Sequence, residues 1–513
     1  MTAPASPLPL PRLAARLSIA GLFRQQVARH PERIVVEGEA RSVDYRTLDE
    51  RTTRLADALR AHGLAHGDRI AMLSENSVEY AELELAAAKL GVILACQNWR
   101  QSDEELQYCI RLVSPKLLVH SARHAAAAAR LDHGVASVIE VESGFEALVA
   151  RGDAAAHFDE VDPETGLIIL YTSGTTGMPK GALISQRAMV ARAMVARFDS
   201  PLQPGDAFVA WGPMFHMVST DSVYATLMHG GKVVVMDGLD PAKLARVAER
   251  EFVGHFTLMP GMIDRMIEEF ERTGIRPKGA RTIGAMADLV PLDQIAKITR
   301  IFGAPYKNSF GSTETGGPPA GRGTIPVGTI PEKLSKWQNS FCEIRLVDED
   351  DNEVPDGQPG ELAFRGPTLF SGYWANDRAN AEDFRGGWFH MGDVFVRNPD
   401  GSLDFVDRRK YLIKSGGENV YPAEIERVLL ASERVAEAVV VRRPDPKWGE
   451  VPVAFVAKAD PTLTADEAKA MCRGRIAGYK QPKDVIFIAL EDFPRSTTGK
   501  VKRHELEALL PKH

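Results

Sequence analysis

Apolar residues recur along this chain first at helical spacing and then in short unbroken runs. Leu48, Leu55 and Leu59 are spaced for one face of a helix, which Gly63 is expected to end. The run DRIAMLSEN at 68–76 follows and is typical of a buried strand. The same order of a helix followed by a strand recurs in three further stretches. They are 81–97 together with 115–121, then 244–261, and then 291–314. This alternation predicts an α/β fold with largely parallel sheets.

The pattern changes after residue 335. The segment FCEIRLVDEDDNEVPDGQPGELAFRG at 341–366 has two alternating strands around an acidic connection, which predicts a hairpin in a smaller β unit. The end of the chain returns to an α+β pattern and finishes in a helix within KRHELEALL. We therefore expect an N-terminal domain at 1–409 and a C-terminal domain at 410–513.

Length and charge narrow the function classes. A chain of 513 residues with 44% hydrophobic residues can form more than one domain. Its net charge of -7 argues against a nucleic-acid partner, because such partners require a basic face. No apolar run approaches the roughly 18 residues that span a bilayer, so we expect a cytoplasmic protein without membrane insertion. A homodimer is left open.

Cysteine spacing indicates neither a metal site nor a redox pair. The cysteines are Cys96, Cys109, Cys342 and Cys472, and they are scattered along the chain. We expect reduced and partly buried thiols.

The most informative segment is YTSGTTGMPKG, Tyr171 to Gly181, which follows the apolar run LIIL. Hydroxyl side chains, glycines and a lysine between a strand and a following helix can direct backbone amides and one positive charge at a phosphate chain. A Walker A loop requires Gly immediately before its Lys, whereas Pro179 precedes Lys180, so that loop is excluded. A surface loop without a ligand is the alternative that composition leaves open.

Five segments together resemble the motifs of the adenylate-forming superfamily of acyl-CoA synthetases, adenylation domains and luciferases. They are YTSGTTGMPKG at 171–181, SFGSTETG at 309–316, GWFHMGDVF at 387–395, the segment 404–426, and PRSTTGKVKRHEL at 494–506. The similarity covers essentially the whole chain, in the family's order. It implies a large N-terminal domain of αβ layers with a small β barrel, and a mobile C-terminal α+β domain. It also implies ATP, Mg²⁺ and coenzyme A as cofactors.

For the phosphates of ATP, the resemblance and the residue types imply the same binding set. The residues that would wrap the β- and γ-phosphates are Thr172, Ser173, Gly174, Thr175, Thr176, Gly177 and Lys180. Glu314 would be a hard oxygen ligand for Mg²⁺, which needs only one or two protein carboxylates. Thr313 would contact the α-phosphate. A solvated loop glutamate is the alternative for Glu314.

For the nucleoside, the resemblance implies that Asp393 accepts the ribose hydroxyls and that Arg408 contacts ribose and phosphates. Either residue could instead be half of a structural ion pair. Phe310 stands where the family usually has Tyr, and stacking on adenine requires only an aromatic face. The other residues expected near the nucleotide are Gly284, Ala285, Ser309 and Gly311.

The C-terminal lysine motif implies a role in the first chemical step. Lys500 would reach the acyl carboxylate and the α-phosphate and stabilise charge mainly in the transition state. A solvated surface lysine is the alternative. The small domain would then rotate about a hinge at Lys410 before thioester formation. After rotation, glycines and a small residue would line the pantetheine tunnel: Ser415, Gly416 and Gly417.

Weaker matches concern coenzyme A. Trp448 is expected to stack on its adenine, and Arg100 and Lys480 to bind its phosphates. A core tryptophan and two surface cations are the alternative. His216 stands where the family's acyl pocket has an aromatic or histidine gate, which indicates a simple carboxylic acid rather than an amino acid. Asp221 could face that pocket or only cap a helix.

Four methionines indicate either an adaptable apolar cavity or plain core packing. They are Met214, Met217, Met259 and Met262. We therefore expect ATP-dependent activation of an aromatic, alicyclic or medium-chain acid to acyl-AMP and pyrophosphate, followed by transfer to coenzyme A with release of AMP. One alternative is a stand-alone enzyme that loads the acyl group onto a carrier protein. Another is a nucleotide-binding protein without catalysis.

Overall fold

A computed structural model describes residues 14–172, 178–259, 261–288, 290–416, 418–495, 499 and 501–510. The chain divides into two compact units. The first unit contains Met1–Glu343 and Arg365–Phe384, and the second contains Ile344–Phe364 and Arg385–His513. The expected hinge at Lys410 lies within the second unit and stays a prediction.

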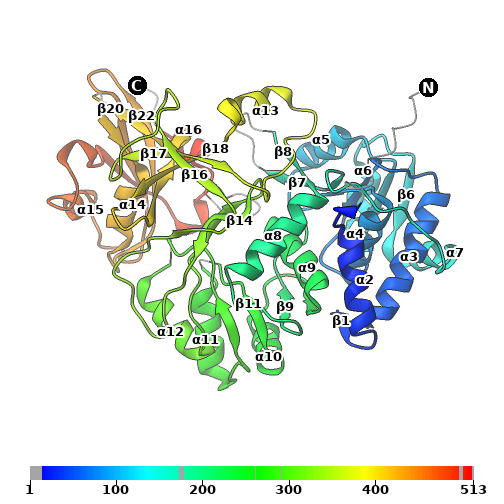
Figure 1. Cartoon of the computed structure of the whole chain (residues 1–513). Helices are drawn as coiled ribbons and strands as arrows, with labels where there is room; N and C mark the ends of the chain where they lie inside the picture. Colours follow the sequence, from blue (N-terminus) through cyan, green and yellow to red (C-terminus); the bar gives the residue numbers. More distant parts are fainter. Residues whose placement is uncertain are drawn as a thin grey trace. The chain divides into compact units, whose positions relative to one another are not determined.

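One six-stranded sheet of the first unit has the strand order β6-β5-β3-β4-β7-β8. Its strands are β3 Arg69–Leu73, β4 Ile93–Cys96, β5 Leu117–His120, β6 Ser137–Glu140, β7 Gly166–Thr172 and β8 Lys180–Ser185. The neighbours from β6 to β7 are parallel, and only the edge strand β8 is antiparallel. Helices of this part are α2 Ile19–Arg29, α3 Tyr45–Ala61, α4 Val78–Leu90, α5 Asp103–Val113, α6 Ala125–Arg130 and α7 Glu146–Arg151 (Figure 1). The largely parallel sheet is confirmed.

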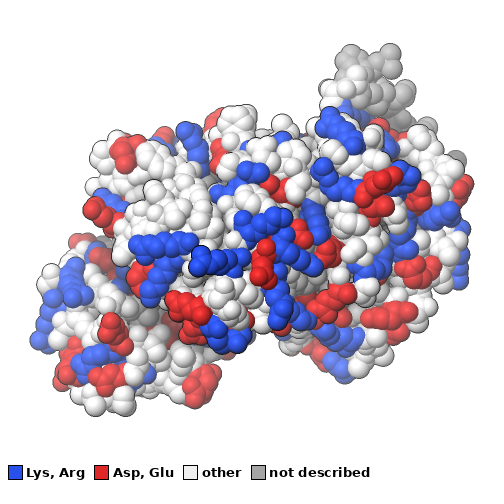
Figure 2. Space-filling view, turned by 90° about the horizontal axis from the view of Figure 1, so that it is seen from below, with Lys and Arg blue, Asp and Glu red and all other residues white. Residues whose placement is uncertain are grey.

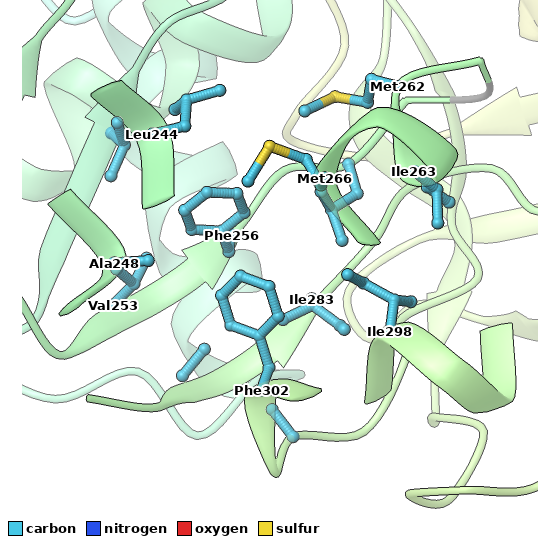
Figure 3. Packing of buried hydrophobic residues seen from close by; sticks show 14 of the residues in the cluster. Leu244, Ala248, Val253, Phe256, Met262, Ile263, Met266, Ile283, Ile298 and Phe302 are labelled. Atoms are coloured by element: carbon cyan, nitrogen blue, oxygen red, sulfur yellow. The ribbon is translucent and has the colours of Figure 1, made fainter. Parts of the chain in front are cut away.

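A second six-stranded sheet has the order β12-β11-β9-β10-β1-β2. Its strands are β1 Ile34–Glu37, β2 Ser42–Asp44, β9 Ala207–Ala210, β10 Lys232–Val235, β11 Val253–Phe256 and β12 Ala280–Ile283. Its helices are α10 Pro241–Arg250, α11 Ile263–Thr273 and α12 Leu292–Phe302. Phe256 and Phe302 meet in the core between these helices and the strands, with ring centroids 4.9 Å apart (Figure 3).

Two further helices connect the sheets of the first unit. They are α8 Gln186–Phe198 and α9 Met217–His229. Helix α8 contacts β8 of the first sheet, α9 contacts β9 and β10 of the second, and the two helices contact each other (Figure 1). A residue on α8 or α9 can therefore reach groups from both halves of this unit.

Shorter β elements follow, as the changed pattern predicted. The first unit has a sheet of β13 Phe310–Ser312, β14 Gly316–Arg322 and β15 Trp337–Gln338, and the short helix α13 Asp377–Asp383. A four-stranded sheet contains β16 Glu343–Val347, β17 Pro359–Arg365, β18 Phe389–Arg397 and β19 Leu403–Arg408. Strands β16 and β17 are neighbours in this sheet, so the hairpin predicted at 341–366 is confirmed.

The rest of the second unit is an α+β structure. Its sheet contains β20 Ile413–Ser415, β21 Glu418–Val420, β22 Val435–Asp445, β23 Gly449–Lys458 and β24 Asp484–Phe487. Its helices are α14 Pro422–Leu430, α15 Ala465–Cys472 and α16 Arg503–Ala508. Two apolar clusters cover the two faces of the β22–β23 hairpin, because alternate strand residues point to opposite sides.

The described residues bear on three sequence expectations, which concern cysteines, membrane-spanning helices and surface charge. All four cysteines are free thiols, and three of them are buried, as predicted. None of the described helices is both long and apolar enough to span a bilayer. Basic and acidic side chains are interspersed over the face shown in Figure 2.

Candidate active site

The motif at 171–181 joins two strands. Strand β7 ends at Thr172 and β8 begins at Lys180, and these two residues lie opposite each other in the antiparallel pair. Helix α8 begins only at Gln186, so the expected turn from strand directly to helix was wrong. The reason is that KGALIS forms a strand that pairs with β7 before the helix begins. The five residues from Ser173 to Gly177 lie outside the described residues.

Lys180 lies between a carboxylate and an aromatic ring. Its Nζ is 3.2 Å from Oδ2 of Asp383 and 3.8 Å from the ring centroid of Tyr373. The Tyr373 hydroxyl donates a hydrogen bond of 2.9 Å to Oε1 of Glu314. Lys180 and Glu314 therefore contact the same tyrosine, although 134 positions separate them in the sequence. Burial raises the pKa of Asp383, and the positive charge of Lys180 opposes this rise.

Tyr373 is held by backbone pairing along the free edge of β8. Trp374 N donates to Gly181 O at 2.8 Å, and Leu183 N donates to Gly372 O at 3.0 Å. The Asn380 side chain also bonds both backbone groups of Tyr373, at 2.7 and 2.9 Å. The backbone of Tyr373 is thereby held beside β8. Sequence reasoning missed Tyr373 and Asp383, because neither lies in the phosphate-loop motif and no local pattern marks them.

Thr313 and Glu314 lie in the turn between β13 and β14. The buried Thr315 shapes this turn, since its hydroxyl donates to Pro318 O at 2.6 Å. No group of three His, Cys, Asp or Glu side chains that could hold a metal occurs among the described residues. Glu314 is a half-buried carboxylate, and carboxylate oxygens are hard ligands of the kind that Mg²⁺ prefers.

Packing within the protein explains some of the residue types at the positions expected near adenine. Gly284 has φ of 106°, and a Cβ there would lie 2.5 Å from the Tyr306 ring, so glycine is required for steric reasons. Ala285 N donates a long hydrogen bond of 3.4 Å to the Tyr306 hydroxyl. Phe310 is 6% exposed. Ser309 is half-buried and Gly311 is exposed, and nucleotide contacts of all these residues stay predictions.

His216 caps the N-terminus of α9. Its Nδ1 accepts a hydrogen bond of 3.4 Å from Val218 N. The methionines divide between the two alternatives: Met214 and Met262 are buried, Met217 is half-buried and Met259 is 37% exposed. Met262 belongs to the core cluster in Figure 3, so packing accounts for that residue.

Arg100 lies against aromatic rings. Its Cζ is 4.9 Å from the ring centroid of Trp99 and 5.9 Å from that of Phe215. Burial lowers the pKa of Arg100, and the negative charge of Asp237 opposes this shift. Phe215 directly precedes His216, so Arg100 lies close to the start of α9.

In the second unit, Asp393 and Arg408 pair with each other. They lie opposite in the β18–β19 ladder, and Arg408 Nε is 2.6 Å from Oδ1 of Asp393. Asp393 is 1% exposed, whereas the Arg408 side chain is 41% exposed. In this structure Asp393 and Arg408 therefore form the structural ion pair that the sequence left open. Their contacts with a nucleotide stay predictions.

Trp448 packs against Gly416. A Cβ at Gly416 would lie 2.7 Å from the Trp448 ring, and Gly416 N donates to Trp448 O at 2.7 Å. Lys447 and Lys483 place their Nζ atoms 4.6 and 5.9 Å from the ring. The expected phosphate ligand Lys480 instead pairs with Glu424 at 2.7 Å. Ser415 is buried, and Gly417 lies outside the described residues.

Lys500 also lies outside the described residues, but residues 494–495 before it and 501–503 after it make contacts within the second unit. Lys502 N donates to Pro494 O at 2.7 Å, and Arg495 forms a β-bridge with Val501. Arg503 donates to Oε2 of the buried Glu426 at 2.9 Å. Residues 494–495 and 501–502 are therefore paired with each other, and Arg503 anchors the start of α16 to Glu426.

Comparison with known families identifies the class of protein. The AMP-binding enzyme family matches residues 23–374, and the AMP-binding enzyme C-terminal domain matches residues 424–500. The chain belongs to the family of AMP-binding enzymes, as the resemblance predicted.

Particular relatives are CoA ligases. The chain is 33% identical to the indoleacetate–CoA ligase of Aromatoleum aromaticum, over 94% of this chain and 96% of that protein. It is 32% identical to a feruloyl-CoA synthase from an Amycolatopsis species, over 93% of this chain and 96% of that protein. Among solved structures, it is similar to o-succinylbenzoate CoA synthetase from Bacillus subtilis in complex with its acyl-adenylate intermediate. That match has a TM-score of 0.83 and 27% identity, and covers 96% of this chain and 99% of the other. The same synthetase has also been solved with ATP and a magnesium ion, with a TM-score of 0.82 and 26% identity over 95% and 99% of the two chains.

Proposed function

We propose that this protein is an AMP-forming CoA ligase that activates an aromatic acid. ATP and the acid react to acyl-AMP and pyrophosphate, and coenzyme A then takes the acyl group and releases AMP. The observation that carries this proposal is the contact of Lys180 and Glu314 with opposite parts of Tyr373. This arrangement places a phosphate-binding cation at the ring of one tyrosine and a metal-binding carboxylate at its hydroxyl.

Attack of a carboxylate on the α-phosphate requires that negative charge on the phosphates be balanced. Glu314 would hold Mg²⁺, and the ion would supply positive charge at the phosphate oxygens. Lys180 would bind the departing pyrophosphate. Asp383 competes for Lys180 before ATP arrives, at an Nζ–Oδ2 distance of 3.2 Å, so phosphate binding must replace this ion pair.

Two residues of the second unit would contact the ribose and the phosphates. Asp393 would accept the ribose hydroxyls, and Arg408, which now pairs with it, would move toward the phosphates. Because Asp393 is nearly fully buried, it needs either the guanidinium or the hydroxyls as a partner. Lys500 would complete the site during adenylation, and rotation about Lys410 would follow before transfer to the thiol.

Coenzyme A is the proposed second substrate. Trp448 offers an exposed aromatic face for adenine, and Lys447 and Lys483 place two positive charges beside that face. Lys483 replaces Lys480 in this assignment, because Lys480 is engaged by Glu424. Arg100 stays a candidate for a phosphate contact.

The aromatic substrate class rests on the relatives and on the start of α9. The named relatives act on indoleacetate and ferulate, and the half-buried His216 and Met217 stand at the head of this helix. An alicyclic or medium-chain acid is the next candidate. A cytoplasmic location and a homodimer stay predictions from the sequence.

The direct test uses the purified full chain with ATP, Mg²⁺ and a panel of aromatic, alicyclic and medium-chain acids. Pyrophosphate release measures the first step, and mass spectrometry of acyl-CoA measures the second. We expect both products with at least one aromatic acid. Acyl-AMP without acyl-CoA would favour the enzyme that loads a carrier protein, and the absence of AMP and pyrophosphate with every acid would reject the ligase.

A further inference from the structure

Arg192 is a buried arginine in α8 whose donors converge on the metal-binding turn. Its side chain is 2% exposed. One terminal nitrogen donates to Thr313 O and to Glu314 O, both at 3.0 Å. Nε donates to Thr368 O, also at 3.0 Å. Three backbone carbonyls from two separate segments are thus held by one planar group.

The charge of this arginine is balanced by Asp221 on α9. The other terminal nitrogen of Arg192 is 3.2 and 3.3 Å from the two carboxylate oxygens. The Asp221 side chain is 14% exposed, so it neither faces solvent nor caps the helix. Burial raises the pKa of Asp221, and Arg192 opposes this rise. A buried cation without such a partner would be strongly unfavourable.

The chain after Glu314 is shaped to fit the guanidinium. Gly316 is the first residue of β14 and has φ of 75°. A Cβ at this position would lie 2.8 Å from Cδ and Nε of Arg192. The absence of a side chain therefore lets the turn rest directly on the arginine.

We propose that Arg192, oriented by Asp221, is a positioning residue that fixes the Thr313–Glu314 turn for Mg²⁺ and ATP. This inference rests on the proposed function, in which Glu314 holds Mg²⁺ and Thr313 contacts the α-phosphate. Arg192 touches neither reactant, and it acts through the backbone carbonyls that it binds. Because Asp221 lies on the helix that begins after His216, the same pair joins the acid-binding end of the site to the metal-binding end.

The test compares Arg192→Lys with wild type. Lysine keeps the charge beside Asp221 but lacks the planar fork that reaches the three carbonyls. We expect the dissociation constant of Mg·ATP, measured by calorimetry without acid, to rise about tenfold, the effect of losing hydrogen bonds from a charged group. The Mg²⁺ concentration for half-maximal pyrophosphate release should rise in parallel, and KM for the acid should change less.

Two further variants make the result decisive. Asp221→Asn leaves Arg192 in place but removes the charge of Asp221, and it should also raise the dissociation constant of Mg·ATP. This variant tests the inference even if the lysine variant does not fold. Lys89→Gln is the matched control, because Lys89 is a buried cation that pairs with Asp49 at 2.7 Å outside the candidate site. It should lower the unfolding temperature and leave the Mg²⁺ dependence unchanged.

The outcomes separate this inference from the proposed function. Folded Arg192→Lys and Asp221→Asn proteins with wild-type Mg·ATP affinity would overturn the positioning role alone. A shift of equal size in Lys89→Gln would also overturn it, because any loss of stability would then suffice. A wild-type protein that binds no Mg·ATP would overturn both.

Discussion

The two units hold their site charges in different ways. In the first unit, Lys180 and Glu314 are kept apart by Tyr373, which contacts one through its ring and the other through its hydroxyl. In the second unit, Asp393 and Arg408 are in direct contact at 2.6 Å. The first arrangement leaves Glu314 with a neutral hydroxyl as its partner, while Lys180 pairs with a third residue, Asp383, at 3.2 Å. In the second unit both site residues pair with each other, so a ligand of either residue has to replace that pair.

This difference follows from burial. Asp393 is 1% exposed, and an ionised carboxylate at such depth requires a positive or hydrogen-bonding partner. The Glu314 side chain is half-buried and already accepts the tyrosine hydroxyl, so it does not need a cation. The comparison predicts that removal of a partner is more harmful in the second unit than in the first.

The largest effect is expected from Lys500→Ala in the second unit. Loss of a charge that acts mainly in the transition state should lower pyrophosphate release by about 100- to 1,000-fold. Thioester formation from synthetic acyl-AMP should change little, because the phosphorus is no longer attacked. Rapid-quench measurement of the two half-reactions gives this ratio, and equal losses in both would contradict the role.

Arg408→Gln comes next and breaks the internal pair. Asp393 then loses the guanidinium that lies 2.6 Å from its Oδ1, so KM for ATP should rise about tenfold and the unfolding temperature should fall. The double variant Arg408→Gln with Asp393→Asn should regain stability, since no buried charge is left, without regaining ATP affinity. If the double variant is no more stable than the single one, the pair is not important for folding.

Tyr373→Phe sharpens the comparison in the first unit. The ring under Lys180 is kept and only the hydrogen bond to Glu314 is lost, so the Mg²⁺ requirement should rise about fivefold, which corresponds to ~1 kcal/mol. Titration of pyrophosphate release with Mg²⁺ at saturating ATP measures the shift. Tyr45→Phe is the matched control, because its hydroxyl donates to Gly231 O at 2.9 Å in the core. A similar change in Mg²⁺ dependence in both variants would refute the assignment.

The smallest effect on activity is expected from Glu84→Gln. Glu84 is fully buried in α4, and neither carboxylate oxygen has a hydrogen-bond partner among the residues that the structure describes. Burial raises its pKa well above 4.5, so the folded protein binds a proton that the unfolded chain releases above pH 4.5. Wild-type stability from this group is therefore complete below pH 4.5 and is lost as pH rises toward the raised pKa. The variant should gain unfolding temperature relative to wild type between pH 5 and 8.

The control for this pH effect is Glu104→Gln at an exposed position of α5, which should show no such trend. Glu361 in the second unit has a pKa shift in the opposite direction. Its pKa is lowered to about 2: burial alone would raise it, but His390, Arg409 and Arg385 more than compensate. Its contribution to stability is present above the ordinary pKa and is lost only as pH falls toward 2. A constant difference between Glu84→Gln and wild type across pH would contradict the buried neutral acid.

Local pattern was sufficient for most elements of the fold. The segment 81–97 forms α4 and β4, and the segment 341–366 contributes the neighbouring strands β16 and β17. The prediction was wrong for the segment that follows the phosphate loop. KGALIS follows Gly and Pro and precedes a helix, so its strand character was overlooked, and the register with β7 became visible only in the sheet.

The sequence by itself determined the family, most of the order of helices and strands, and the motif residues such as Lys180, Glu314 and Asp393, because motifs and periodicity are local properties of the chain. Only the tertiary structure decided their partners. Tyr373 reaches Glu314 across 59 positions and Asp383 reaches Lys180 across 203. Such pairs depend on how β8, α8 and the segment 365–384 pack together. A buried charge requires a partner, and the packing of distant segments decides which group lies beside it.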